Sequence, residues 1–135
     1  MPEITGIAHV ELSVRDLDRS VEFYNTLLNA RDVWRGSSDE YGITACAIFE
    51  PNSRMVLAFT RHNEQEPEPF SPRRPGLDHV SFGVADRDAL VEWVARLDQL
   101  GIEHSPIQDD HTPPSVTFRD PDGIALELSY TPRRA

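Results

Sequence analysis

The chain contains the same unit twice, at a spacing of 70 residues. Residues 6–10 (GIAHV) align with residues 76–80 (GLDHV), and the same shift places Phe23 on Trp93. Near the end of each unit, FEPNSRMVLAF corresponds to FRDPDGIALEL. An internal duplication constrains the architecture strongly, because each copy must form the same supersecondary unit and bury an equivalent apolar face.

The repeat predicts how the chain is divided. We expect one domain over residues 1–135, with a first module at 4–60 and a second module at 76–131. The segment between them, residues 61–75, contains four prolines and mixed charges. This composition is typical of an exposed linker.

Each module is predicted to fold as βαβββ, which makes the chain an α+β protein. Period-two alternation at residues 7–14 and 77–84 is typical of strands with one buried face. Apolar residues at helical spacing follow, and Asp16 and Asp86 are placed to cap the two helices. Gly101 suits the left-handed position after the second helix. The remaining predicted elements are helices at 17–29 and 87–100, strands at 43–49, 54–60, 115–119 and 124–130, and a tight turn at Asp120-Pro121-Asp122-Gly123.

Charge and composition exclude several classes of function. The chain has 13 basic and 23 acidic residues, for a formal net charge of −10, so nucleic acid is not expected as a partner. Every basic residue is an arginine, which rules out Schiff-base chemistry on a lysine side chain. The single cysteine, Cys46, precludes an internal disulfide and is expected in the core. No apolar run is long enough to span a membrane and no signal peptide is recognisable, so we expect a cytoplasmic protein.

Strand alternation singles out three residues with metal-binding side chains. The apolar residues of the predicted strands at 7–14, 77–84 and 124–130 face the helices, so the intervening His9, His79 and Glu127 project from the opposite faces. Two imidazoles and a carboxylate form a ligand set for a divalent first-row metal with open positions. His9 and His79 are also related by the 70-residue repeat. The pattern predicts a site for one divalent ion of Fe, Mn, Ni, Co or Zn.

Three segments resemble the vicinal oxygen chelate superfamily: IAHVELSVRDLDRSVEFYNTLL, PGLDHVSFGV and TFRDPDGIALEL. This superfamily includes glyoxalase I, methylmalonyl-CoA epimerase, type I extradiol dioxygenases, fosfomycin-resistance enzymes and bleomycin-binding proteins. The resemblance implies two tandem βαβββ modules whose mixed sheets curl into a cup, commonly in a homodimer. It also implies metal ligands at His9, His79 and Glu127, drawn from one chain in some members and shared between two chains in others.

The individual activities of this superfamily each meet a departure in the sequence. Glyoxalase I and the epimerases add a fourth ligand at the position of Leu57, or of Ala58 if one residue is skipped, and neither side chain binds metal. Glu50 reaches that position only in another register. Extradiol enzymes have a tyrosine where Thr117 stands, and fosfomycin enzymes have lysine-bearing loops that this chain lacks.

We therefore expect a divalent-metal-dependent enzyme, a glyoxalase-like lyase or isomerase or an extradiol-type dioxygenase. Its substrate would be a small molecule that chelates the metal through neighbouring oxygens. The alternative is a metal-free, bleomycin-resistance-like protein that sequesters an antibiotic.

Five further assignments accompany the metal ligands. Glu127 and Glu11 are the candidate catalytic carboxylates, Glu11 as a general base. Arg119 is a candidate anchor for an anionic substrate, Trp34 a candidate wall of the binding site, and His111 a candidate rim residue. Each also has a structural interpretation as a solvated or packed surface side chain. His62, in the linker, and His104, just after the second helix, are expected to be exposed.

Overall fold

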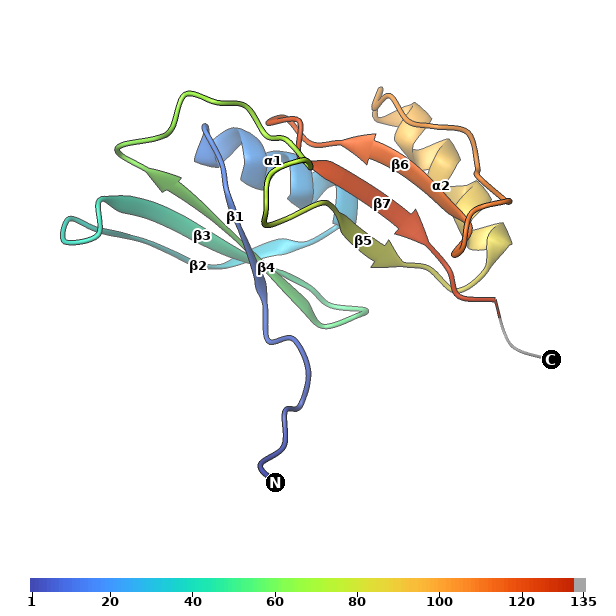
Figure 1. Ribbon diagram of the computed structural model, residues 1–135, viewed down its shortest axis with the longest axis horizontal. Coiled ribbons are helices and arrows are strands. Elements are labelled where there is room, and N and C mark those ends of the chain that lie inside the picture. Colours follow the sequence, from blue (N-terminus) through green and yellow to red (C-terminus); the bar gives the residue numbers. More distant parts are fainter. Residues whose placement is uncertain (133–135) are drawn as a thin grey trace. The chain divides into compact units, whose positions relative to one another are not determined.

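The computed structural model describes residues 1–132, and the last three residues of the predicted domain lie outside this part (Figure 1). The chain divides into a first module, Met1–Glu68, and a second module that begins at Pro69. Both modules have a strand, a helix and then further strands. The first contains β1 (Val10–Ser13), α1 (Leu17–Leu28), β2 (Arg31–Ser38), β3 (Ile43–Glu50) and β4 (Met55–His62), and the second contains β5 (Val80–Gly83), α2 (Arg87–Gln99), β6 (Ser115–Arg119) and β7 (Ala125–Ser129).

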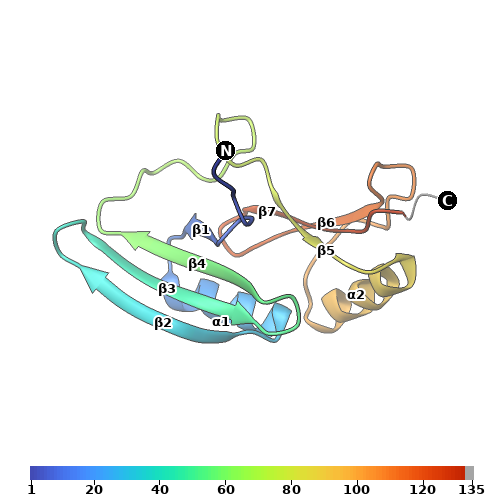
Figure 2. The ribbon, with the colours of Figure 1, turned by 90° about the horizontal axis from the view of Figure 1, so that it is seen from below.

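The first module has a four-stranded mixed sheet in the order β1-β4-β3-β2, which can be followed in Figure 2. β1 runs parallel to β4, and the other two pairs are antiparallel. α1 packs on one face of this sheet, where Tyr24 stacks on Phe59 with ring centroids 4.7 Å apart. The predicted apolar side chains of the helix are all buried, which confirms its amphipathic pattern: Leu17, Val21, Tyr24, Leu27 and Leu28.

The second module has a three-stranded mixed sheet in the order β5-β7-β6. β5 is parallel to β7, as β1 is to β4. The strand that would correspond to β2 is reduced to isolated bridges at His104 and Gln108. The chain around these bridges contains Pro106 and two further prolines, which cannot donate to a ladder of hydrogen bonds.

The helix caps and turns confirm the local predictions. Asp16 and Asp86 each accept a hydrogen bond from the backbone three residues on, at 3.1 Å and 2.9 Å. Gly101 has a φ of +67°, as expected after the second helix. Gly6 and Gly76 have φ values of +137° and +138°, so the repeat extends to the backbone conformation before each first strand.

The predicted turn at residues 120–123 is also present. The Oδ1 atom of Asp120 accepts hydrogen bonds from the backbone N–H groups of Asp122 (2.8 Å) and Ile124 (2.9 Å). Gly123 takes a positive φ of +77°. The side chain of Asp120 thus closes the hairpin that joins β6 to β7.

The structure differs from the sequence expectations at three places. β2 supplies the strand of the βαβββ pattern to which the sequence assigned no residues, and β4 continues through Arg61 and His62 into the predicted linker. His104, expected at the surface, has only 15% of its side chain exposed. Its ring bonds Asp98 at 2.7 Å and the carbonyl of Ser105 at 2.6 Å, which holds it against the module.

Neither described helix is long and apolar enough to cross a membrane.

Candidate functional site

Two of the three predicted metal ligands lie side by side in the second module. Glu127 is on β7, and its neighbour across the parallel pair with β5 is Ser81. His79 directly precedes β5 and projects to the same face as Ser81, away from the buried side chains of Phe82 and Leu128. The Nε2 atom of His79 is 3.9 Å from the Oε2 atom of Glu127. The structure therefore confirms that these two side chains share the face opposite α2.

The other polar atoms of both side chains have partners within the module. The Nδ1 atom of His79 is 2.6 Å from Oδ1 of Asp78. The hydroxyl of Ser81 donates to Oε1 of Glu127 at 2.9 Å and lies 2.8 Å from the hydroxyl of Ser129. A serine has one proton to donate, so Ser129 is the donor in the second contact. His79 Nε2 and Glu127 Oε2 are left facing one another.

The first module carries His9 and Glu11 in the places that correspond to His79 and Ser81. Both are exposed, at and just before the start of β1. β1 pairs with β4 so that Glu11 lies beside Ala58, as Ser81 lies beside Glu127. Ala58 is therefore the structural counterpart of Glu127.

Backbone hydrogen bonds support this register. The N–H of Val14 donates to the carbonyl of Thr60, and the N–H of Val84 donates to the carbonyl of Ser129, both at 2.9 Å. The first strands are related by a shift of 70 residues, whereas Thr60 and Ser129 are 69 apart. The position open to a fourth ligand in the first module is consequently filled by Ala58, whose methyl group cannot bind a metal.

Glu50 serves another purpose. Its carboxylate accepts hydrogen bonds from the backbone of Asn52 (2.9 Å) and Ser53 (2.7 Å) and from the hydroxyl of Ser53 (2.6 Å). Partial desolvation opposes ionisation, but these bonds outweigh it and lower the pKa of Glu50. The residue closes the turn between β3 and β4 and is accounted for without a metal.

Within residues 1–132, the structure contains no group of three or more His, Cys, Asp or Glu side chains arranged to hold a metal ion. His79 and Glu127 are brought together in the second module, and His9 is presented by the first. The participation of His9 in a common site remains a prediction.

The three predicted substrate-binding residues have different surroundings. Arg119, on β6, donates to the carbonyl of Gly123 at 2.8 Å, and its guanidinium lies 5.8 Å from the centre of the Phe70 ring. Its charge is still available to an anion, because neither partner is a carboxylate. His111 is exposed in the turn that follows Gln108, and its backbone N–H donates to the Gln108 carbonyl at 3.3 Å.

Trp34 offers the largest exposed aromatic surface of the first sheet. It lies on β2 opposite Ala47, on the face that also carries Glu11 and Ala58, and 57% of its surface is exposed. A methyl group added at Gly36 would lie 2.7 Å from the Trp34 ring, so the indole covers that glycine. The lack of a side chain at Gly36 thus leaves room for the Trp34 ring to lie along the sheet surface.

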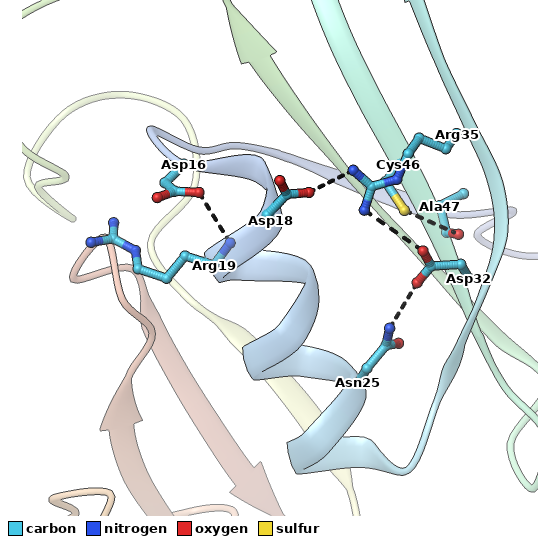
Figure 3. A network of polar contacts seen from close by, with 8 residues as sticks. All are labelled: Asp16, Asp18, Arg19, Asn25, Asp32, Arg35, Cys46 and Ala47. Carbon is cyan, nitrogen blue, oxygen red and sulfur yellow. Dashed lines mark hydrogen bonds and ion pairs between the residues drawn. The ribbon is translucent and has the colours of Figure 1, made fainter.

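Cys46 is not part of this face. It is fully buried on the side of the sheet that α1 covers, and its sulfur contacts the carbonyl of Ala47 at 3.8 Å (Figure 3). Arg35 and Asp32 are close by, and Arg35 binds Asp18 of α1 at 2.7 Å. Burial first, and the charge of Asp32 next, raise the pKa of the Cys46 thiol. The thiol stays protonated and serves as core, as the sequence predicted.

Three residues around the candidate ligands have no role assigned from the sequence: Asp78, Ser81 and Ser129. Two signals could have found them. Ser81 and Ser129 share the strand face of His79 and Glu127, because they lie two residues from them. Asp78 precedes a histidine at the edge of a strand, where a short carboxylate can reach the ring nitrogen nearer the backbone.

Comparison with known proteins gives a consistent family match. The model of the Glyoxalase/Bleomycin resistance protein/Dioxygenase superfamily matches residues 6–128. The crystal structure of a glyoxylase/bleomycin resistance protein/dioxygenase domain from Frankia sp. EAN1pec has a TM-score of 0.87 and 31% identity, and the match covers 98% of this chain and 96% of that one.

Some of the similar proteins have names that state a function. Metallothiol transferase FosB of Bacillus licheniformis is 30% identical over 128 residues, which are 93% of this chain and 75% of the relative. The FosX fosfomycin resistance protein of Listeria monocytogenes, solved with Mn(II) and sulfate, is 18% identical with a TM-score of 0.68, and the match covers 96% and 95% of the two chains. The latter likeness concerns the fold. The chain is thus similar to fosfomycin resistance proteins although it has no lysine.

Proposed function

Because the chain belongs to the Glyoxalase/Bleomycin resistance protein/Dioxygenase superfamily, we propose that it is a divalent-metal-dependent enzyme acting on a small oxygen-chelating substrate. The proposed ligands are His9, His79 and Glu127. The observation that carries the proposal is that His79 Nε2 and Glu127 Oε2 face each other, 3.9 Å apart on one sheet face.

The donor set fits a first-row metal. A separation of 3.9 Å is shorter than two metal–ligand bonds of about 2.0–2.2 Å laid end to end, so one ion can contact both atoms. Imidazole nitrogen and carboxylate oxygen together suit Mn, Fe, Co, Ni and Zn. Mn(II) is the first ion to test, because the FosX structure named above contains it.

When bound, the ion would supply a Lewis acid that polarises the substrate oxygens. The chain's own residues would do the remaining work. Glu11 is exposed and lies two residues after His9, on the same face of the first sheet. It is the proposed general base, which would accept a proton from the substrate. Arg119 is the proposed anchor for an anionic group, and Trp34 and His111 are proposed to limit the site.

The named relatives direct the choice of substrate and reaction. One is called a metallothiol transferase, and a solved FosX variant holds 1S,2S-dihydroxypropylphosphonic acid, an anion with neighbouring oxygens. We propose that a small phosphonate or carboxylate of this kind is the substrate class. The first reaction to assay is opening of a strained cyclic ether on such an anion by a thiol or by water: a new S–C or O–C bond forms, the ring C–O bond breaks, and the freed oxygen takes up the nucleophile's proton. The lyase, isomerase and dioxygenase reactions follow.

Metal content tests the proposal directly. Purified protein is stripped with a chelator, reloaded with Mn, Fe, Co, Ni or Zn, and measured by elemental analysis beside His79→Ala and Glu127→Gln. We expect about one ion per chain, lost in both variants. His62→Ala is the matched control, because His62 is an exposed strand histidine outside the proposed site. Metal binding that is unchanged in His79→Ala would refute the proposal.

A mixing experiment tests the proposed homodimer and the origin of His9. If two chains share each site, refolding His9→Ala together with His79→Ala restores about a quarter of the metal sites, because mixed dimers contain one intact set. If each chain builds its own site, the mixture binds no metal. Light scattering on the wild type measures the dimer itself.

The second candidate is a metal-free binding protein for an aromatic antibiotic. The exposed indole of Trp34 is the observation that favours it. Failure to bind any metal after reconstitution, combined with quenching of tryptophan fluorescence by a bleomycin-type drug and loss of that quenching in Trp34→Ala, would support this reading over the enzyme.

A further inference from the structure

We infer that Asp78 and Ser81 are positioning residues that select which atoms of His79 and Glu127 face a metal ion. The inference rests on the proposed function and extends it to two residues outside the ligand set. Each of the two ligands has one atom hydrogen-bonded to a neighbouring side chain of the second module, and the other atom of each ligand faces the other ligand.

Asp78 determines the orientation of the imidazole. The side chain of His79 is 42% exposed, so packing alone leaves its ring rotation loosely fixed. Asp78 Oδ1 lies 2.6 Å from Nδ1, and a carboxylate can only accept, so Nδ1 carries the proton. The lone pair is then on Nε2. A second carboxylate behind a ligating histidine both fixes the tautomer and makes the imidazole a stronger donor.

Ser81 determines the orientation of the carboxylate. Its hydroxyl donates to Oε1 of Glu127, and Ser129 donates in turn to Ser81. This chain of two hydroxyls occupies one carboxylate oxygen and turns the other, Oε2, toward His79. The side chain of Glu127 is only 17% exposed, so few alternative rotamers compete with this arrangement.

The first module supplies an internal control for the role of these residues. At the places of Asp78, Ser81 and Glu127 it has Ala8, Glu11 and Ala58. It nevertheless forms the same parallel pair of strands and the same capped helix. The βαβ framework thus does not require an aspartate or a serine at these positions, and their presence only where both ligands occur argues for a role in binding.

Affinity for Mn(II) tests the inference, measured by competition with a chromogenic chelator. We expect Asp78→Ala and Ser81→Ala each to weaken binding by about 10–100-fold. Ser81→Thr keeps the hydroxyl and is expected to retain most of the affinity, as is Asp78→Asn, whose amide oxygen can still accept from Nδ1. The melting temperature of the metal-free protein is expected to stay within a few degrees of the wild type.

Two matched controls separate positioning from general damage. Thr117→Val removes a hydroxyl from β6, the strand that flanks β7 on the side opposite β5; Thr117 pairs with Glu127 there. Asp88→Ala removes an exposed carboxylate from the first turn of α2. Both are expected to bind Mn(II) as the wild type does. Equal loss of affinity in the controls and in the two test variants would overturn the inference.

The outcome also distinguishes this inference from the proposed function. If His79→Ala abolishes binding while Asp78→Ala and Ser81→Ala bind normally, the ligand assignment holds and the positioning role is wrong. If His79→Ala binds Mn(II) as tightly as the wild type, the proposed function itself fails. Absorption spectra of the Co(II) form provide a second readout, because altered ligand orientation changes the bands even where the metal remains bound.

Discussion

Replacement of Asp120 by alanine tests how the β6–β7 hairpin is closed. The side chain lies at the turn that leads into β7, and the residue is only 6% exposed. One oxygen, Oδ1, accepts from the backbone N–H groups of both Asp122 and Ile124. The second of these bonds is buried, so water cannot replace the lost acceptor there.

The magnitude follows from these two bonds. Hydrogen bonds to a charged group contribute about 1.5–3 kcal/mol each, and a buried unpaired N–H costs about 1–3 kcal/mol. The Asp122 N–H is half-buried and can recover part of its loss through water. We therefore expect Asp120→Ala to lower the free energy of unfolding by about 2–4 kcal/mol. Asp120→Asn keeps an oxygen acceptor in the same place but loses its charge, so it is expected to cost less than the alanine variant, about 1–2 kcal/mol.

Urea denaturation of both variants measures the difference, and amide hydrogen exchange locates it. The Ile124 N–H should lose protection in Asp120→Ala but keep it in Asp120→Asn. Because Glu127 follows three residues after Ile124 on β7, we also expect weaker Mn(II) binding in the alanine variant. Equal stability of the two variants, or protection of Ile124 that survives the loss of the carboxylate, would refute the reasoning.

Three further predictions concern the packing of each module. The backbone carbonyl of Ser105 and then Asp98 raise the pKa of His104, so its contribution to stability is complete below the ordinary value of 6.5 and is lost as the pH rises through the higher folded value. The free energy of unfolding in urea should therefore fall less between about pH 5 and pH 8 in His104→Gln than in the wild type. An unchanged pH dependence would contradict this. Gly36→Ala should displace the Trp34 ring, since the new methyl would lie 2.7 Å from it. The NMR resonance of the Trp34 indole N–H should therefore shift. An NMR spectrum identical to that of the wild type would show that the ring does not cover the glycine. Phe59→Ala should cost about 3–5 kcal/mol in urea, because the ring is fully buried under α1, and a loss below 1 kcal/mol would mean that the site collapses to fill the cavity.

The repeat made most of the fold predictable. Helix ends were correct to within one residue, because Asp16 and Asp86 provide cap chemistry that acts over three residues of sequence. The βαβββ pattern predicts a strand between the first helix and residue 43, but its residues could not be assigned. β2 is an edge strand with mostly exposed residues, so it shows no alternation of buried and exposed positions. Its pairing with β3 comes from the backbone, which the side-chain pattern does not report.

The candidate site was predictable only in part. The alternation of side chains along each strand correctly predicted that His79 and Glu127 share one face, because alternation depends only on neighbours within a single strand. The hydroxyl chain behind Glu127 depends instead on which residues lie beside each other across two strands, and Ser81 is 46 residues away in sequence. Neither composition nor periodicity carries that information.

The hairpin connections explain why the fourth position of the site could not be assigned from the sequence. In the first module Ala47 pairs with Ala58, eleven residues on, whereas in the second Thr117 pairs with Glu127, ten residues on. Counted between these equivalent pairs, the connection in the second module is therefore one residue shorter. A uniform shift of 70 would match Glu127 with Leu57, a buried residue on the helix side of β4.

A slip of one residue turns a strand's side chains to the opposite face, so the length of this connection decides what Glu127 can do. With the shorter connection, the carboxylate occupies the outward position that Ala58 holds in the first module, beside Ser81. The buried oxygen of Asp120 fixes that shorter connection by holding two of its N–H groups. In the first module the carboxylate is Glu11, on β1, whereas in the second module it is Glu127, on β7. The two copies therefore share one framework but differ in which strand of the parallel pair carries the acid. The asymmetry of the proposed site thus originates in a turn, several residues away from any ligand.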